Sequence, residues 1–268
     1  MNTKSKSTLQ KLKNKLRVQN YAKTTIKTYC SYAEMFLSYF NQDVYHIPIK
    51  DVQHYLENYD YSSVSQQNQI ISSVKFLFKN VVGRKLGTLN IVRPRKQKKL
   101  PKIIDAEILA LKIKSIPNLK HKSILALGLS CGLRISEVIN LKWIDLDRNR
   151  NILNVINGKG RKDRCCILND DMIELLTDYW KEHKSKKYVF NGQFKDQYST
   201  TSIQKIVKKY IDKKASYHLL RHSYATYALD NGTKLAPLSA SMGHSSTKTT
   251  EIYFHVSKKS LKTIKQAI

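Results

Sequence analysis

The chain has 268 residues and a formal net charge of +28, because 48 lysines and arginines stand against 20 aspartates and glutamates. Hydrophobic residues make up 41% of it, enough to form folded cores, which excludes a disordered basic tail. The longest nearly apolar run, residues 124–133, is far shorter than the roughly 20 residues that cross a bilayer, and the polar start has no signal-type hydrophobic region. We therefore expect a cytoplasmic protein with one large or two ordinary domains.

The positive charge lies in both parts of the chain. Residues 1–100 hold 18 basic and 5 acidic side chains, and residues 101–268 hold 30 and 15. A surface that only aids solubility usually carries both positive and negative charges, whereas binding to a polyanion is favoured by a large excess of positive charge. Nucleic acid is therefore the expected partner, which would make the protein nucleoid-associated. The four cysteines show no metal-finger spacing, so we expect reduced thiols.

Residues 5–90 predict helices, because apolar side chains recur at i, i+3 and i+4 over residues 26–40 and again over 64–82. We assign residues 1–87 to a small helical domain. Residues 88–101 predict a linker in which Pro94 and Pro101 interrupt any regular structure. Its basic residues are expected to lie along phosphates: Arg93, Arg95, Lys96, Lys98 and Lys99.

Residues 102–268 predict a second domain that is again mostly helical. A β-hairpin is expected from residues 152–156 and 165–168, which flank the glycine-containing segment 157–163. In the predicted helix 217–230 we expect Leu220, Tyr224 and Tyr227 to form a buried stripe. The predicted helices are 105–114, 120–131, 170–184, 202–211 and 217–230, followed by shorter ones at 237–242, 247–253 and 257–267.

Cleavage of a DNA phosphodiester without a metal would need cationic donors for the negative charge of the transition state, a nucleophile, and a proton for the leaving oxygen. Arg134 follows a helix end with Glu137 near enough to orient it, and His218 and Arg221 share one helix face at i, i+3. Each also has an ordinary structural interpretation, as a surface arginine or a histidine at a helix start.

Three further side chains complete the candidate set. Lys159 lies at the tip of the predicted hairpin, His244 follows a helix end marked by a glycine, and Tyr253 comes nine residues later. A lysine on a hairpin is usually only solvated, and one tyrosine among 16 has no special claim by composition. His218 and His222 form an HxxxH, but leucine follows where a zinc protease would have glutamate, so we expect no metal site and no cofactor.

These segments, in this order, resemble the tyrosine recombinase (phage integrase) family, most closely in the layout of its Xer-type and integron-type members. The four matching segments are GLRISEVINLKWIDLD, NGKGRKDR, HLLRHSYATYALDNGT and MGHSSTKTTEIYFHV. The segments TTIKTYCSYAEMFLSYF and IISSVKFLFKN resemble helices of the family's core-binding domain, so the resemblance covers nearly the whole chain. It implies an N-terminal SAM-like helical domain and a mainly helical catalytic domain with a small sheet, which together clamp double-stranded DNA.

The resemblance also implies roles for the candidate residues. Arg134 and Arg221 would hold the scissile phosphate, with hydrogen bonds from His218 and His244, and His218 would also be the general base. Lys159 would be the general acid, and Tyr253 would be the nucleophile that forms a 3′-phosphotyrosyl bond. Glu137 would support Arg134 from behind, and Arg161 and Lys162 on the hairpin would bind DNA.

Because the covalent link keeps the ester energy, the family needs neither metal nor ATP. The resemblance further implies a homotetramer on two DNA sites. We therefore expect a site-specific recombinase, and two other hypotheses stay open. A DNA-binding regulator could keep the clamp without catalysis, and a type IB topoisomerase would share the chemistry but relax DNA without partners.

Overall fold

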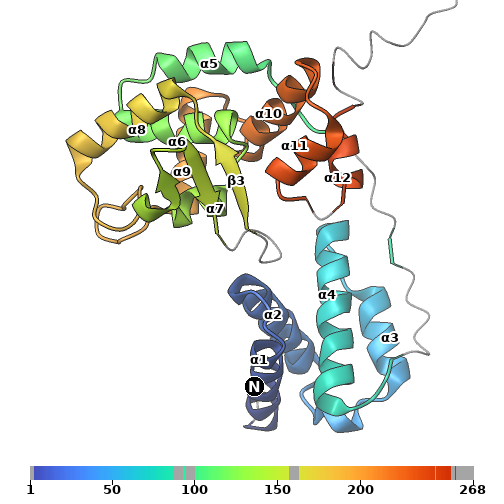
Figure 1. The fold of residues 1–268 in the computed structure, drawn as a ribbon. Coiled ribbons are helices and arrows are strands. Elements are labelled where there is room, and N and C mark those ends of the chain that lie inside the picture. Colours follow the sequence, from blue (N-terminus) through green and yellow to red (C-terminus); the bar gives the residue numbers. More distant parts are fainter. Residues whose placement is uncertain are drawn as a thin grey trace, which may run out of the picture. The chain divides into compact units, whose positions relative to one another are not determined.

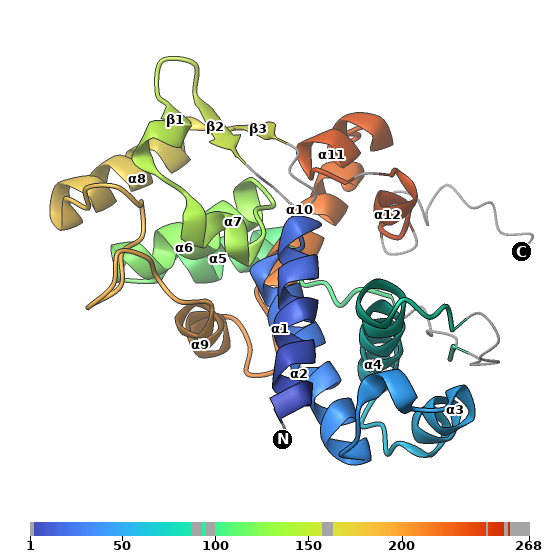
Figure 2. The same ribbon diagram turned by 90° about the horizontal axis from the view of Figure 1, so that it is seen from below.

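The computed structural model of the chain describes residues 3–86, 93–94, 100–156, 163–244, 246–254 and 257. Figures 1 and 2 show the ribbon from two directions. The chain divides into two compact units, Met1–Lys98 and Lys99–Ile268, each with its own hydrophobic core. Most of the predicted linker lies outside the described residues, so the predicted boundaries at residues 87 and 102 stay predictions.

The first unit is helical, as predicted. The helix α2 (Lys23–Phe40) packs against α1 (Thr3–Val18) and α4 (Val64–Leu77), and Figure 1 shows these helices in blue and cyan. The predicted apolar face over residues 64–82 is confirmed, since its members Ile70, Val74, Leu77 and Phe78 are all buried. The elements are α1 (Thr3–Val18), α2 (Lys23–Phe40), the 3₁₀ turn η1 (Val44–His46), α3 (Ile49–Asn58), α4 (Val64–Leu77) and the π-helical turn η2 (Phe78–Val82).

Local signals explain where α4 starts and where the helical segment ends. The Ser63 side chain accepts a hydrogen bond from the backbone N–H of Gln66 at 3.1 Å, which caps the first turn. At the other end Gly83 takes φ +80°, a left-handed conformation that terminates helices and that other residues adopt at a cost.

The second unit is built around one buried helix, against which five others pack. This central helix is α6, and α5, α7, α8, α9 and α10 surround it. The elements are α5 (Ala106–Lys114), α6 (Leu119–Ser130), α7 (Ile135–Asn140), the 3₁₀ turn η3 (Trp143–Asp145), β1 (Leu146–Asp147), β2 (Ile152–Val155), β3 (Arg164–Ile167), α8 (Asp170–His183), α9 (Thr200–Tyr210), α10 (His218–Asp230), α11 (Leu235–Ser241) and α12 (Lys248–Glu251).

The sheet is antiparallel with strand order β1-β2-β3, and Figure 2 shows it edge-on with α11 beyond β3. The predicted hairpin is confirmed as β2 and β3, paired from Ile152 with Ile167 to Val155 with Arg164. The strand β1 was not predicted, because two residues are too few to show an alternating pattern. Through β3 the sheet contacts α11, which brings the hairpin next to the C-terminal elements.

Some sequence predictions need correction. The helix α11 begins at Leu235 rather than Pro237, and the proline is tolerated because it still lies in the first turn, where its missing N–H has no partner to lose. The predicted buried stripe is wrong at Tyr227, which is 48% exposed, because α10 buries its opposite face against α5, α6 and α11. The helix α12 is shorter than residues 247–253, and the predicted helix 257–267 lies almost wholly outside the described residues.

None of the described helices combines the length and the apolar character that crossing a membrane requires.

The packing of α6 against α10 predicts that Gly128→Ala destabilises the second unit. A Cβ at Gly128 would lie 2.6 Å from the Tyr217 hydroxyl oxygen and 3.0 Å from Leu220 Cδ1, and both neighbours are fully buried. Overpacking of this kind costs about 1–3 kcal/mol, against about 1 kcal/mol that alanine gains in a helix. Tryptophan fluorescence during urea unfolding isolates this unit, because Trp143 and Trp180 are the only two tryptophans.

We expect a net loss of unfolding free energy for Gly128→Ala and a smaller loss in a Tyr217→Phe background, where the nearest clashing atom is gone. Equal losses in both backgrounds would contradict this packing.

Candidate active site

Arg134 is the N-cap residue of α7, and Glu137 stands three residues later in the first turn. The Glu137 carboxylate accepts the Arg134 backbone N–H at Oε2 and the Arg134 Nη1 at Oε1, both at 2.7 Å. Gly132 precedes this turn with φ +57°, where the chain leaves α6 and reverses direction. The short spacing predicted from the sequence therefore produces a direct ion pair, with the Arg134 side chain 14% exposed.

Arg221 lies on α10 and is almost completely buried, with 3% of its surface exposed. Its Nη1 donates to the carbonyl of Gly132, and its Nη2 donates to the carbonyl of Met242 at 2.6 Å. The same Nη2 is 3.0 Å from Nε2 of His244. Arg221 therefore connects the turn before α7 and the turn after α11 to α10.

The turn after α11 is fixed by its own backbone before any side chain acts on it. The N–H of His244 donates to the carbonyl of Ser239 at 3.0 Å, and the N–H of Gly243 donates to Ala240 at 2.9 Å. Gly243 takes φ +61°. These bonds form a Schellman motif, which explains the glycine at this position and sets the direction in which His244 leaves the helix.

Beyond these bonds, three successive carbonyls at the end of α11 each accept a hydrogen bond from a different arginine. Carbonyls at a helix C-terminus lack intrahelical partners and carry partial negative charge, so they suit cationic donors. The pairs are Arg164 Nε with Ser241 at 2.6 Å, Arg221 Nη2 with Met242 at 2.6 Å and Arg134 Nη2 with Gly243 at 3.1 Å.

The hydrogen bonds of His244 determine its tautomer. Arginine can only donate, so Nε2 accepts from Arg221, and in the neutral ring Nδ1 carries the proton. That proton is directed at Thr250 Oγ1, which lies 2.7 Å away on α12. The imidazole is thus held between α10 and α12, next to one of the two arginines.

The charged groups of this cluster shift one another's pKa values. Burial alone would raise the pKa of Glu137, but hydrogen bonds and charge from Arg164, together with those from Arg134, outweigh it and lower the pKa to about 2. Burial and the neighbouring Arg134 lower the pKa of Arg221 to about 10, so this guanidinium stays charged at neutral pH. The cluster therefore keeps an excess of positive charge in a partly dry environment.

Tyr253 lies beside this cluster, but its ring is buried. Only 3% of the residue is exposed, and it packs with Ala225, Leu238 and Met242 in a small apolar cluster. Its hydroxyl is 2.9 Å from His222 Nδ1. Burial raises the pKa of the phenol, while the charges of Arg221 and Arg134 oppose that rise.

The structure brings some candidates together and not others. Arg134, Glu137, Arg221 and His244 form one connected group. His218 is exposed at the first residue of α10, with its ring centroid 6.4 Å from that of His222. Among the described residues, no three His, Cys, Asp or Glu side chains are grouped as metal ligands would be.

The remaining candidates concern DNA binding and proton donation. Arg93 belongs to the first unit, where it donates to Asn68 Oδ1 at 3.3 Å and Ser72 Oγ at 3.2 Å. The others lie outside the described residues: Lys159, Arg161, Lys162, Arg95, Lys96, Lys98 and Lys99.

Sequence reasoning missed two residues of the cluster, Arg164 and His222. Alternation along β3 was an available signal for Arg164, because Cys166 and Leu168 on the same strand face are apolar. The contact of His222 with Tyr253 had no such signal, since the two residues are 31 positions apart.

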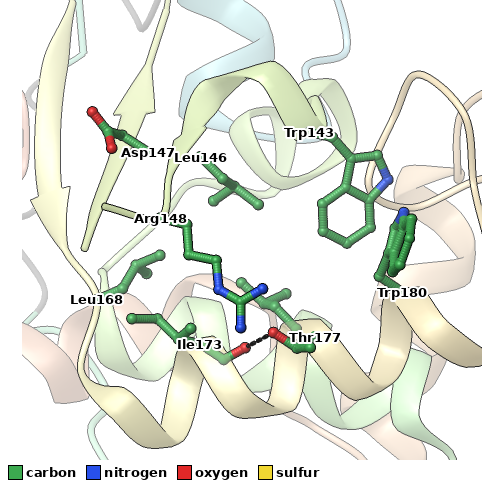
Figure 3. Close-up of a pocket in the computed structure, with 9 residues that line it drawn as sticks. Trp143, Leu146, Asp147, Arg148, Leu168, Ile173, Thr177 and Trp180 are labelled. Atoms are coloured by element: carbon green, nitrogen blue, oxygen red, sulfur yellow. Dashed lines mark hydrogen bonds between the residues drawn. The ribbon is translucent and has the colours of Figure 1, made fainter. Parts of the chain in front are cut away.

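The apolar pocket shown in Figure 3 is separate from this cluster. It has a volume of about 300 Å³ and contains none of the candidate residues. Figure 3 shows Trp143 and Trp180 on one side and Arg148 reaching toward Thr177, whose hydroxyl donates to the Ile173 carbonyl at 2.7 Å.

Comparisons with known proteins show the family of the chain. Residues 97–260 match the family described as "Phage integrase family", and residues 8–88 match "Phage integrase, N-terminal SAM-like domain". The chain is 30% identical to a protein named tyrosine recombinase XerA from Pyrococcus horikoshii, over 95% of this chain and 90% of that protein.

Two solved structures share the fold. A crystal structure of XerA recombinase is 26% identical, with a TM-score of 0.55 over 96% of both chains. A structure of XerH bound to its palindromic difH substrate, described as a post-cleavage complex, is 23% identical, with a TM-score of 0.71 over 91% of this chain and 80% of that chain. The chain therefore belongs to the phage integrase family and is a tyrosine recombinase.

Proposed function

We propose that this recombinase acts on double-stranded DNA, that Arg134 and Arg221 bind the scissile phosphate, and that Tyr253 attacks the phosphorus. The observation that carries the proposal is the convergence of both guanidinium groups on the turn that holds His244. A phosphodiester gains negative charge in its transition state, and guanidinium forks match its oxygens in geometry and charge.

The surplus of charge supports this assignment. The guanidinium groups of Arg134, Arg164 and Arg221 face one hydrogen-bonded carboxylate, that of Glu137, among the described residues. Two positive charges are therefore left for an incoming anion. Fixed donors in a water-poor site stabilise developing charge more strongly than the same groups in water.

The chemical steps follow from the residue types. The Tyr253 hydroxyl loses its proton as its oxygen bonds to phosphorus, the bond from phosphorus to the 5′ oxygen breaks, and the 3′ end stays on the enzyme. The proposal keeps His218 as the general base and Lys159 as the donor of a proton to the leaving 5′ oxygen. A 5′ hydroxyl from another strand then reverses these steps and releases the tyrosine.

The buried position of Tyr253 corresponds, in this proposal, to the resting enzyme. Before attack, the phenol must exchange its hydrogen bond with His222 for a position against the phosphate. Four copies on two duplexes would bring the exchanging strands together, and this assembly is part of the proposal by family resemblance. Arg93, Arg161 and Lys162, with the basic residues 95–99, would contact the DNA backbone.

Tyr253→Phe should abolish the covalent protein–DNA complex that forms when a nicked suicide substrate traps the cleaved strand. The substitution removes the attacking oxygen and the hydrogen bond to His222 but keeps the buried ring. Denaturing gel electrophoresis of labelled DNA measures the adduct. Tyr227→Phe, at an exposed tyrosine of α10, is the matched control and should form the adduct normally. An adduct that persists in Tyr253→Phe would contradict the assignment of the nucleophile.

Arg134→Ala and Arg221→Lys should each slow single-turnover cleavage by about 100-fold or more, because each removes a donor to the developing charge. Lysine is used at position 221 because alanine would leave the buried carbonyls of Gly132 and Met242 without donors. Binding to the cognate site, measured by fluorescence anisotropy, should weaken much less. Parallel losses of binding and cleavage would count against a role in the transition state.

His222 should make the stability of the second unit depend on pH. Burial, His218 and Arg221 lower its pKa from 6.5 to about 4, so the unfolded chain binds a proton more readily than the folded one. The contribution of the neutral His222 to the free energy of unfolding is therefore fully present above pH 6.5. It is lost as the pH falls toward 4, and the loss is about 1–2 kcal/mol after solvent screening. Urea unfolding, monitored by tryptophan fluorescence, should show a smaller loss of unfolding free energy between pH 6.5 and pH 4 for His222→Phe than for the wild type. Identical pH profiles would refute the linkage.

A further inference from the structure

Arg164 is the first residue of β3, on the strand that follows segment 157–162. Its side chain is only 5% exposed, although the neighbouring Cys165 and Ile167 face solvent. An arginine buried to this extent cannot reach a DNA backbone while it keeps this conformation. Its charge must therefore act on other parts of the protein.

The contacts of Arg164 use its whole guanidinium group. Nη1 and Nη2 donate to the two oxygens of Glu137 at 2.8 and 2.7 Å, and Nε donates to the carbonyl of Ser241 at 2.6 Å. The fork on Glu137 has the parallel geometry that makes arginine–carboxylate pairs both strong and directional. One side chain therefore connects β3, the first turn of α7 and the last turn of α11.

Both partners of Arg164 lead to residues of the proposed reaction. Oε1 of Glu137 accepts from Arg134 Nη1 as well as from Arg164 Nη1, so the two guanidinium groups share one oxygen. The Ser241 carbonyl lies three residues before His244, at the start of the Schellman turn. At Gly243, a Cβ would lie only 3.1 Å from Arg164 Cδ, so the arginine also packs closely against that turn.

We propose that Arg164 is a positioning residue for strand cleavage, acting through Glu137 on Arg134 and through the α11 turn on His244. The inference rests on the proposed function and adds to it a residue that touches neither DNA nor the reacting atoms. Lysine cannot replace it, because a single ammonium cannot fork onto Glu137 and also reach the Ser241 carbonyl.

The test compares Arg164→Lys and Arg164→Met with wild type in single-turnover cleavage of a suicide substrate. Small displacements of catalytic groups cost up to about 100-fold in rate, so we expect a loss of about 10- to 100-fold in both variants. The Kd for DNA should change by less than about threefold, since the side chain is not on the binding surface. Arg150→Met, which removes a side chain 79% exposed on the turn before β2, is the matched control and should cleave normally.

A substrate with sulfur in place of the bridging 5′ oxygen separates this role from that of Lys159. A thiolate leaves without a proton, so the modified substrate should restore cleavage to Lys159→Ala. It should not restore cleavage to either Arg164 variant, because their defect lies in the groups around the phosphate. Full rescue of the Arg164 variants would overturn the proposal by placing their defect in leaving-group protonation.

Two further outcomes would also overturn it. Cleavage at the wild-type rate per folded molecule, with folding measured by tryptophan fluorescence, would make Arg164 purely structural, and an equal loss of DNA affinity would make it a binding residue. If Arg164→Met does not fold, Arg164→Lys still decides, because it keeps the buried charge. A wild-type protein that forms no adduct would instead be a failure of the proposed function.

Discussion

The site depends on three arginine side chains that hold three successive carbonyls at the end of α11. Arg164, Arg221 and Arg134 come from β3, α10 and the start of α7, and they converge on residues 241–243. Helix ends normally leave these carbonyls to water. Here they accept hydrogen bonds from the arginines, so the end of one short helix also orients the groups proposed to bind phosphate.

This arrangement explains why one carboxylate is buried among so many cations. Glu137 offsets part of the repulsion between the guanidinium groups, and its lowered pKa keeps it ionised at any pH at which the protein would work. Removing one partner of such a buried ion pair strongly lowers the free energy of unfolding. The members of the group are therefore held in fixed positions. A rigid group with surplus positive charge is suited to stabilise a transition state in which the scissile phosphate carries more negative charge than in the ground state.

The proposed nucleophile, Tyr253, is the exception to this rigidity. The arginines and His244 are hydrogen-bonded into one group, whereas the Tyr253 hydroxyl lies next to His222 inside a small apolar cluster. An oxygen kept in this position cannot attack solvent-borne phosphates. The proposed phosphate site is therefore already assembled, whereas the proposed nucleophile must change its hydrogen-bond partner before it reacts.

Much of this could be predicted from the sequence, and the limits have physical causes. Helical periodicity predicted the core positions Ile70 and Val74, and the three-residue spacing of Arg134 and Glu137 predicted their contact, since both are local properties. The contacts of Tyr253 with His222 and of Arg164 with Ser241 could not be predicted, because they join residues 31 and 77 positions apart. The exposure of Tyr227 is likewise set by the helices against which α10 packs.

The most direct test is to locate the covalent bond by mass spectrometry. The protein–DNA adduct is digested with nuclease and trypsin, which releases residues 249–258, a peptide in which Tyr253 is the only tyrosine. The proposed mechanism predicts a 3′-phosphonucleotide on Tyr253, with a free 5′ hydroxyl on the departing strand. A nucleotide on any other residue, or a 5′-linked nucleotide on Tyr253, would contradict it.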